Sequence, residues 1–185
     1  MTDHILEIDW NEKTGWAKPK ISAYKPFQID PANSTLHYAL ECFEGMKAYP
    51  HVNGKDINLF RAKDNMKRMN NSFEKLAFPN FDIDEAIKSI IELVKLDKEW
   101  IPRKYNHSLY IRPTGIAMEN TLGVKPTSDV KFFAIISPVG PYYPQGFKPV
   151  SVYCALDAVR AWPNGNGDKK LGANYGPTIQ PALKV

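Results

Sequence analysis

Two adjacent lysines near the end of the chain are the residues best suited to covalent chemistry. Lys169 and Lys170 lie in the stretch GDKKLGANYG, and Tyr175 follows Lys170 within it. The glycines of this stretch allow backbone conformations that other residues avoid, so the loop can bring an amine close to a bulky planar ligand whose phenolic oxygen Tyr175 would reach. The same composition is typical of a solvated turn. This stretch by itself leaves both interpretations open.

A second pair of functional groups comes from the segment SLYIRPT. Tyr110 and Arg112 are two residues apart, so on a strand both side chains emerge from the same face. A phenol and a planar cation on one face suit the recognition of a carboxylate. An edge-strand arginine that pairs with a surface acid is the alternative.

Aromatic and basic residues elsewhere extend this set. In LHYALECFEGMKAY, Tyr38 and Phe43 are expected either in the core or in the wall of an apolar pocket. In DNMKRM, Arg68 is expected on a helix, where it is either solvated or, near a helix end, able to hold a phosphate.

The hydrophobic pattern predicts the elements that position these side chains. Two short strands are expected around Asn53-Gly54 as a tight hairpin in which both turn residues have positive φ. Helices are expected over residues 62–77 and after Asp82, whose spacing to Glu85 is that of a capping box. HSLYIRP and VKFFAIISP are expected to be strands that each stop at a proline. This mixture without strict alternation predicts the α+β class.

A change of composition predicts the domain organisation. Residues 137–149 contain four prolines and two glycines, which is typical of a stiff surface connection. We therefore expect a small domain over residues 1–140, a linker over 141–149, and the incomplete start of a larger domain over 150–185. A strand is expected at VSVYCAL, and a helix is expected to begin near Tyr175, with Pro177 in its first turn.

Composition and charge exclude several functional classes. The net charge is +4, yet the basic residues are scattered among acids, so no nucleic-acid partner is expected. No apolar run approaches the roughly 20 residues of a membrane helix, so no membrane partner is expected. The four histidines have no metal-binding spacing, so no metal is predicted. Two distant cysteines and an acidic amino terminus predict a reducing, cytoplasmic location, with a mitochondrial one possible if an upstream segment is missing.

Taken together and in order, the motifs HYALECFEGMKAY, NMKRM, SLYIRPT, LGVK, SPVGPYY and VRAWPNGNGDKKLGANYGP closely resemble the branched-chain amino acid aminotransferases. These are pyridoxal-phosphate enzymes of fold type IV. The resemblance extends from residue 2 to about residue 177. It implies transamination of leucine, isoleucine and valine with 2-oxoglutarate, giving branched 2-oxo acids and glutamate.

The resemblance also implies residue roles. Lys170, in the family pattern K-x-G-x-N-Y, would form the Schiff base with pyridoxal 5'-phosphate, Tyr175 would bind the phenolic oxygen of this cofactor, and Arg68 its phosphate. The residues expected around the substrate are Tyr38, Phe43, Tyr110, Arg112, Val124 and Tyr142. In the family, the position of Val124 contributes to the neighbouring subunit's site, which implies a homodimer. Arg160 matches a family position to which we assign no role.

By the same resemblance the family extends beyond the last residue of this chain, through the acid that pairs with the pyridine nitrogen. The chain is therefore expected to be truncated within its large domain and to show little or no turnover alone. The alternatives are a truncated, non-catalytic interaction module and another fold-type-IV enzyme. A P-loop nucleotide binder is disfavoured, because NGNGDKK lacks the spacing of that motif.

Overall fold

The computed structural model describes residues 1–143, 145–146 and 148–183. The strands are β1 (His4–Asn11), β2 (Gly15–Trp16), β3 (Lys20–Ala23), β4 (Glu41–Phe43), β5 (Met46–Pro50), β6 (Ile57–Leu59), β7 (Ser108–Ala117) and β8 (Asp129–Val139). The α-helices are α1 (Ser34–Tyr38), α2 (Ala62–Lys75), α3 (Ile83–Leu96) and α4 (Ile179–Ala182). Short 3₁₀ turns are η1 (Lys98–Trp100), η2 (Gly172–Asn174) and η3 (Gly176–Thr178).

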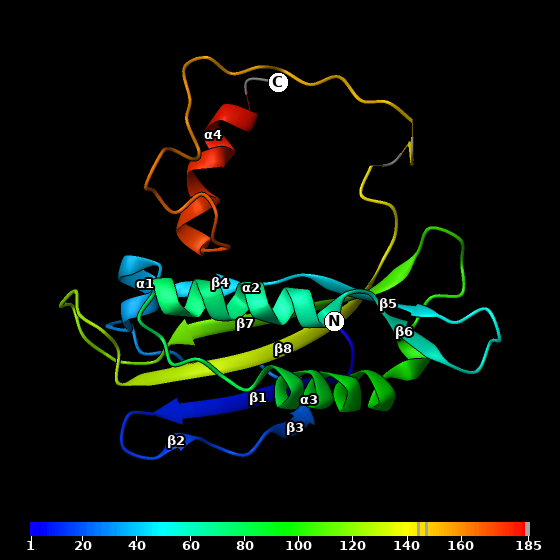
Figure 1. The fold of residues 1–185 in the computed structure, drawn as a ribbon, viewed down its shortest axis with the longest axis horizontal. Helices are drawn as coiled ribbons and strands as arrows, with labels where there is room; N and C mark the ends of the chain where they lie inside the picture. Colours follow the sequence, from blue (N-terminus) through cyan, green and yellow to red (C-terminus); the bar gives the residue numbers. More distant parts are fainter. Residues whose placement is uncertain (144, 147, 184–185) are drawn as a thin grey trace.

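The strands form one antiparallel sheet with the order β2-β1-β8-β7-β5-β6, in which β3 also pairs with β1 and β4 with β7. The long central pair β7 and β8 joins Ser108 to Val139 at one end and Ala117 to Val130 at the other. Helices α2 and α3 lie over the same face of this sheet (Figure 1). The predicted α+β class is confirmed by this arrangement and by the fold comparisons below.

The core lies between the two helices and the sheet, where the apolar spacing of each element places it. Met66, Met69 and Phe73 recur on one side of α2 and are fully buried. Phe73 packs so closely on the sheet that a Cβ at Gly115 would stand 2.4 Å from its ring, so this strand position accepts only glycine without a shift. The predicted cap is present at α3, where the Asp82 carboxylate accepts the amide hydrogens of Asp84 and Glu85.

Two local predictions need correction. The hairpin forms, but β5 and β6 are joined by residues 51–56, and positive φ occurs at Gly54 and not at Asn53. The strands β7 and β8 also continue through Pro113 and Pro138 instead of stopping there. The Pro113 carbonyl accepts from the Glu44 amide, at the gap between β4 and β5. In an antiparallel sheet the nitrogen and the carbonyl of one residue face the same neighbouring strand. The Pro113 nitrogen therefore faces away from β8, and its missing N–H interrupts no hydrogen bond to β8.

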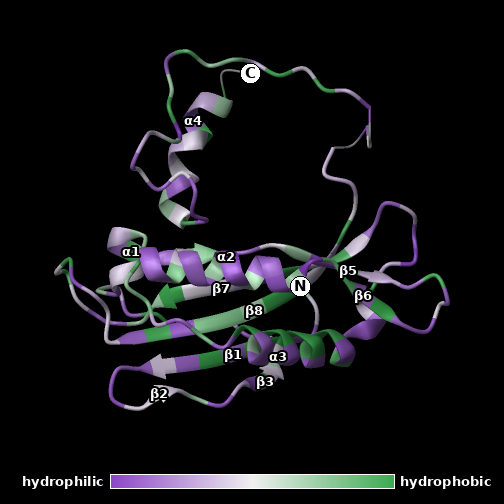
Figure 2. Cartoon of the chain, viewed as in Figure 1, coloured by the Kyte–Doolittle hydropathy of each residue, from purple (hydrophilic) through white to green (hydrophobic). Residues whose placement is uncertain are grey.

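The strand predicted at VSVYCAL is absent. Residues 149–158 contain neither helix nor strand in the structure, and they run beyond the sheet as an extended connection (Figure 1). Figure 2 shows apolar positions along this stretch, and Val152 and Leu156 are 86% and 92% exposed. An apolar sequence forms a stable strand only beside another strand, and no described strand pairs with this one.

The sequence interpretation also missed elements in the first 45 residues. Strands β1 to β4 and helix α1 were not predicted there, although Asn33 caps α1 by accepting the Thr35 amide hydrogen. Strand β4 is only three residues long, too short to produce a periodic signal. It is nevertheless the strand on which the lysine loop rests.

Candidate functional site

The loop that carries Lys170 docks on strand β4 through its backbone. The Phe43 amide donates to the Lys170 carbonyl over 3.0 Å, and Cys42 forms a bridge with Leu171. The Lys170 amide in turn donates to the Ser72 hydroxyl of α2 over 3.1 Å. Leu171 is buried in the core, so this loop is part of the packed structure, and the interpretation of it as a solvated turn is wrong for its backbone.

The Lys170 side chain faces two aromatic rings. Its ammonium nitrogen lies 3.3 Å from the Tyr175 hydroxyl and 5.1 Å from the centre of the Phe43 ring. The Phe43 and Tyr175 rings are themselves 4.9 Å apart. Residues 132 positions apart in sequence therefore surround one amine.

A small cavity of about 240 Å³ opens beside this amine, and cations dominate its lining. The residues that line it are Glu44, Arg68, Ser72, Arg160, Gly167, Asp168, Lys169, Lys170 and Tyr175. Two of its acids are already engaged, since Glu44 pairs with Arg68 and Asp168 with Lys169. The remaining cationic groups make this cavity suited to an anion.

Lys169 and Lys170 differ in their environments. The Lys169 ammonium ion-pairs with Asp168, and this hydrogen bond lowers the pKa of the Asp168 carboxyl. Lys170 instead contacts Tyr175 and the Phe43 ring. The Lys169 charge is therefore paired with a neighbouring carboxylate, whereas the Lys170 amine faces aromatic groups.

Phe43, Tyr110 and Arg112 form a compact cluster next to the lysine. The predicted shared face of Tyr110 and Arg112 is present, because the Arg112 guanidinium donates to the Tyr110 hydroxyl over 2.8 Å. The same guanidinium lies 4.4 Å from the centre of the Phe43 ring. The alternative, an arginine paired with a surface acid, does not describe these contacts.

The other three predicted substrate residues lie outside this cluster. Tyr38 donates a hydrogen bond to the Leu122 carbonyl, in the loop that also carries Val124. Val124 is 78% exposed. Tyr142 is 90% exposed and contacts the ring of Tyr143. The structure therefore joins Phe43, Tyr110, Arg112, Lys170 and Tyr175, whereas Tyr38 lies half-buried outside this cluster and Val124 and Tyr142 are exposed.

Sequence reasoning missed the residues that support the lysine loop. The buried Ser72 hydroxyl accepts from the Lys170 amide, and the Asn174 side chain donates to the carbonyls of Asn166 and Lys169. Glu44, which lines the same cavity, was assigned no role from the sequence. Asn174 had a usable signal, because it stands in the K-x-G-x-N-Y pattern, whereas nothing local distinguishes Ser72 from other helical serines.

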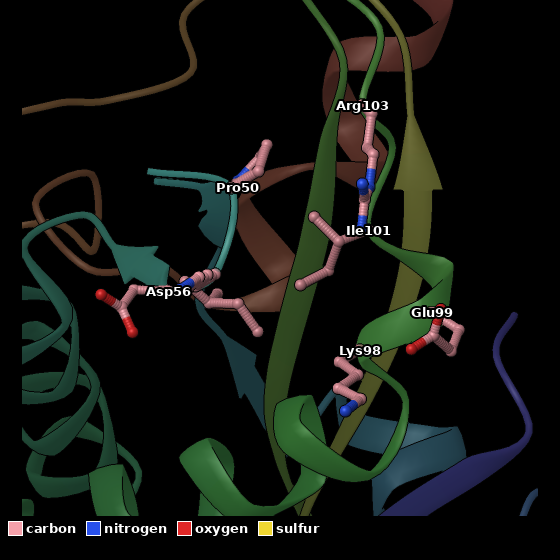
Figure 3. Close-up of a pocket in the computed structure, with 9 residues that line it drawn as sticks. Pro50, Asp56, Lys98, Glu99, Ile101 and Arg103 are labelled. Atoms are coloured by element: carbon pink, nitrogen blue, oxygen red, sulfur yellow. The ribbon is translucent and has the colours of Figure 1, made fainter. Parts of the chain in front are cut away.

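A larger concavity of about 370 Å³ lies elsewhere, between the β5–β6 hairpin and the segment after α3. Figure 3 shows its lining, which includes Pro50, Asp56, Lys98 and Arg103. Its lining contains none of the predicted catalytic, cofactor-binding or substrate-binding residues. We therefore assign the candidate active site to the smaller cavity, because that cavity is lined by Lys170, Tyr175 and Arg68.

Two general features of the described residues complete this description. No group of three or more His, Cys, Asp or Glu side chains among them is arranged to hold a metal ion. None of their helices combines the length and apolar character that a membrane crossing requires.

Solved structures share this fold. A branched-chain aminotransferase from Thermoproteus uzoniensis with norvaline matches with a TM-score of 0.70 and 18% identity, over 97% of this chain and 56% of that one. The PLP form of the enzyme from Thermobaculum terrenum matches with a TM-score of 0.55 and 19% identity, over 74% of this chain and 40% of that one. The fold is therefore that of the fold-type-IV aminotransferases.

Sequence comparison defines the family. No family model matches the chain. The branched-chain-amino-acid aminotransferase of Dictyostelium discoideum is 51% identical over 184 residues, which are 100% of this chain and 48% of that protein. The cytosolic enzyme of Rattus norvegicus is 47% identical over 96% of this chain and 43% of its own length, and the mitochondrial enzyme of Saccharomyces cerevisiae is 46% identical over 100% and 47%. By sequence this chain belongs to the branched-chain-amino-acid aminotransferase family, and it spans about half the length of the curated relatives it matches.

Proposed function

We propose that this chain carries the lysine and phosphate side of a pyridoxal-phosphate site that transaminates branched-chain L-amino acids. The observation that carries the proposal is the Lys170 amine, 3.3 Å from the Tyr175 phenol and beside a cationic cavity that contains Arg68. The sequence similarity to branched-chain-amino-acid aminotransferases supports the substrate class.

The residues present fit this cofactor. A phosphate needs cationic donors. The Arg68 side chain can supply them, because it is 58% exposed and its guanidinium is held in place by an ion pair with Glu44. A phenolate oxygen needs a donor, and Tyr175 supplies a hydroxyl close to the lysine. An aldehyde needs a primary amine, which Lys170 supplies.

When bound, pyridoxal phosphate supplies electron withdrawal from the Cα of an amino acid. The chain's own residues then have separate tasks. Lys170 would hold the cofactor at its aldehyde, and its amine would move the proton at Cα of the substrate. Arg68 binds the phosphate and Tyr175 the phenolic oxygen. Phe43 covers one side of the amine, which helps to exclude water from the proton transfer.

For the substrate, we propose that Phe43 lines an apolar side-chain pocket and that Tyr110 and Arg112 act at the carboxylate end. The direct contacts among these three side chains support this division. Leucine, isoleucine and valine would be the amino donors, with 2-oxoglutarate and glutamate as the partner pair.

The exposed residues Val124 and Tyr142 support a site that is closed by further protein. Together with the half-buried Tyr38 they would complete the pocket in a homodimer, with Val124 serving the neighbouring subunit's site. Because Lys170 is only partly buried, we expect little turnover of leucine and 2-oxoglutarate by the 185-residue chain alone.

We also propose a cytoplasmic location. The two cysteines are free thiols in the structure, Cys42 buried and Cys154 exposed, which is usual in a reducing compartment. The curated relatives include proteins named cytosolic and proteins named mitochondrial.

Borohydride trapping tests the proposed function. The purified chain is incubated with pyridoxal phosphate, reduced, and digested for mass spectrometry. We expect one dominant pyridoxyl-lysine at Lys170, because among the lysines that the structure describes this amine is the one hydrogen-bonded to Tyr175 at the anion cavity. Lys170→Ala should remove that label, whereas Lys169→Ala, the matched control on the adjacent residue, should retain it. Equal labelling of many surface lysines would refute the assignment.

A further inference from the structure

The Glu44 carboxylate is the one acid of the candidate cavity that is fully buried, at 0% exposure. It lies in the link between β4 and β5 and accepts hydrogen bonds from three neighbours. The Asn65 amide donates to it over 2.9 Å, and the Gly45 backbone amide over 3.1 Å. Arg68 donates to both of its oxygens.

The Arg68 contact is bidentate and uses a single edge of the guanidinium. Nε lies 2.8 Å from one carboxylate oxygen, and Nη2 lies 2.7 Å from the other. This planar pairing fixes the rotation of the guanidinium as well as its position. The hydrogens of Nη1 remain for a ligand, on a side chain that is more than half exposed.

The Asn65 side chain, which supports Glu44, is also held in place. Asn65 is itself buried and uses its second amide hydrogen to donate to the Gly45 carbonyl over 2.8 Å. The carboxylate therefore accepts four hydrogen bonds on its two oxygens, and two of these come from Arg68. Its effect on any ligand must pass through Arg68.

We propose that Glu44 is a positioning residue that holds the Arg68 guanidinium ready for the phosphate of the cofactor. The proposal rests on the proposed function. Glu44, which Asn65 holds in turn, fixes one edge of the arginine from the buried side, and the other edge of the guanidinium remains free to face the cavity. Without this buried carboxylate, a long exposed arginine would have to lose rotamer freedom on each binding event.

The test compares two ligands that differ only in the phosphate group. Dissociation constants for pyridoxal phosphate and for pyridoxal are measured by absorbance with the wild-type chain and with Glu44→Gln. We expect Glu44→Gln to weaken pyridoxal phosphate about tenfold, since a hydrogen bond to a charged group is lost, and to leave pyridoxal within about twofold. Equal weakening of both ligands, or no change in either, would overturn the proposal.

Asp64→Asn is the matched control for charge. Asp64 lies one helical turn before Arg68 on α2 and pairs with Arg61 instead. Its substitution removes the same unit of negative charge without touching the bidentate pair. We expect it to leave the ratio of the two dissociation constants within about twofold of wild type. A tenfold change in this control would show that net charge, and not positioning, sets phosphate affinity.

A second measurement does not depend on the cofactor. The rate of phenylglyoxal modification at Arg68 is measured by peptide mass spectrometry in the wild-type and Glu44→Gln chains. We expect several-fold faster modification in Glu44→Gln, because its guanidinium is released; equal rates would overturn the proposal whatever the binding data show. The two measurements separate this proposal from the proposed function. If the wild-type chain binds pyridoxal phosphate no more tightly than pyridoxal, the assignment of Arg68 to the phosphate is wrong. Slower phenylglyoxal modification of Arg68 in the wild-type chain than in Glu44→Gln would still show that Glu44 holds the guanidinium.

Discussion

At the scale of single residues, the two cysteines have opposite environments. The Cys42 side chain is fully buried, facing the core from strand β4, and burial together with the nearby Glu41 carboxylate raises the pKa of its thiol. Cys154 is exposed, in the segment that has no helix or strand. Since the thiolate is the reactive form, the two thiols should react at very different rates.

Alkylation of the native chain with iodoacetamide at pH 8, followed by peptide mass spectrometry, measures this difference. We expect Cys154 to be modified about a hundredfold faster than Cys42 or more, because Cys42 is both protonated and shielded. Unfolding in denaturant should bring the two rates together, which is the control for intrinsic reactivity. Comparable rates in the native chain would contradict the burial of Cys42 beneath the lysine loop.

At the scale of elements, a buried carboxylate joins the first strand to the end of a helix. Asp97 follows α3 and accepts hydrogen bonds from the backbone amide and the ring of His4 in β1, the latter over 2.6 Å. Burial raises the pKa of the Asp97 carboxyl, but hydrogen bonds from the amino-terminal residues outweigh it, and the pKa lies below its ordinary value. This contact helps to hold α3 on the sheet.

Asp97→Asn should therefore destabilise the chain in a pH-dependent way. Because the folded pKa is lower than the unfolded one, the stabilisation is present above the unfolded value, near pH 4, and is lost as the pH falls through the folded value. Urea unfolding should show a loss of about 1 to 3 kcal/mol at pH 7 that shrinks below about pH 4. Glu92→Gln, an exposed acid on the same helix, is the control and should change stability by less than about 0.5 kcal/mol. An Asp97→Asn effect that is unchanged at pH 3 would contradict this account.

At the scale of the whole molecule, the chain contains one packed unit and one extended connection. The sheet and helices α2 and α3 share a single core, which Leu171 joins from the lysine loop. In the sequence between β8 and the lysine loop, residues 149–158 have no helix or strand and carry exposed apolar side chains. We therefore keep the division into residues 1–140 and 150–185 as a proposal. In this division the lysine loop packs on the core of the first unit through Leu171, although it lies in the second unit by sequence.

Limited proteolysis with chymotrypsin tests this division. We expect the first cleavages at Tyr153, Leu156 or Trp162, which are exposed in segments without helix or strand, and a stable fragment that retains residues 1–140. The control is the set of aromatic sites in the core, such as Phe73 and Phe132, which should remain uncut. Early cleavage within β7 or β8 would contradict a first unit that is folded independently.

The sequence by itself determined what depends on neighbouring residues. The cap at Asp82, the buried stripe of α2 and the shared face of Tyr110 and Arg112 follow from spacing along one element, and the motif order led to the family. It could not show that the strand at residues 150–156 would lack a partner, or that Pro113 would fall in the gap between β4 and β5.

Contacts between groups that are far apart in sequence became evident only in the folded chain. Ser72 supports the Lys170 backbone and Phe43 covers the Lys170 amine, although 98 and 127 residues respectively separate them in sequence. Glu44, in the link between β4 and β5, holds Arg68 of α2, from which the β5–β6 hairpin separates it in sequence. The physical reason is that such contacts arise when separate elements bury their apolar faces together, and the polar groups left at their edges must then find partners in three dimensions.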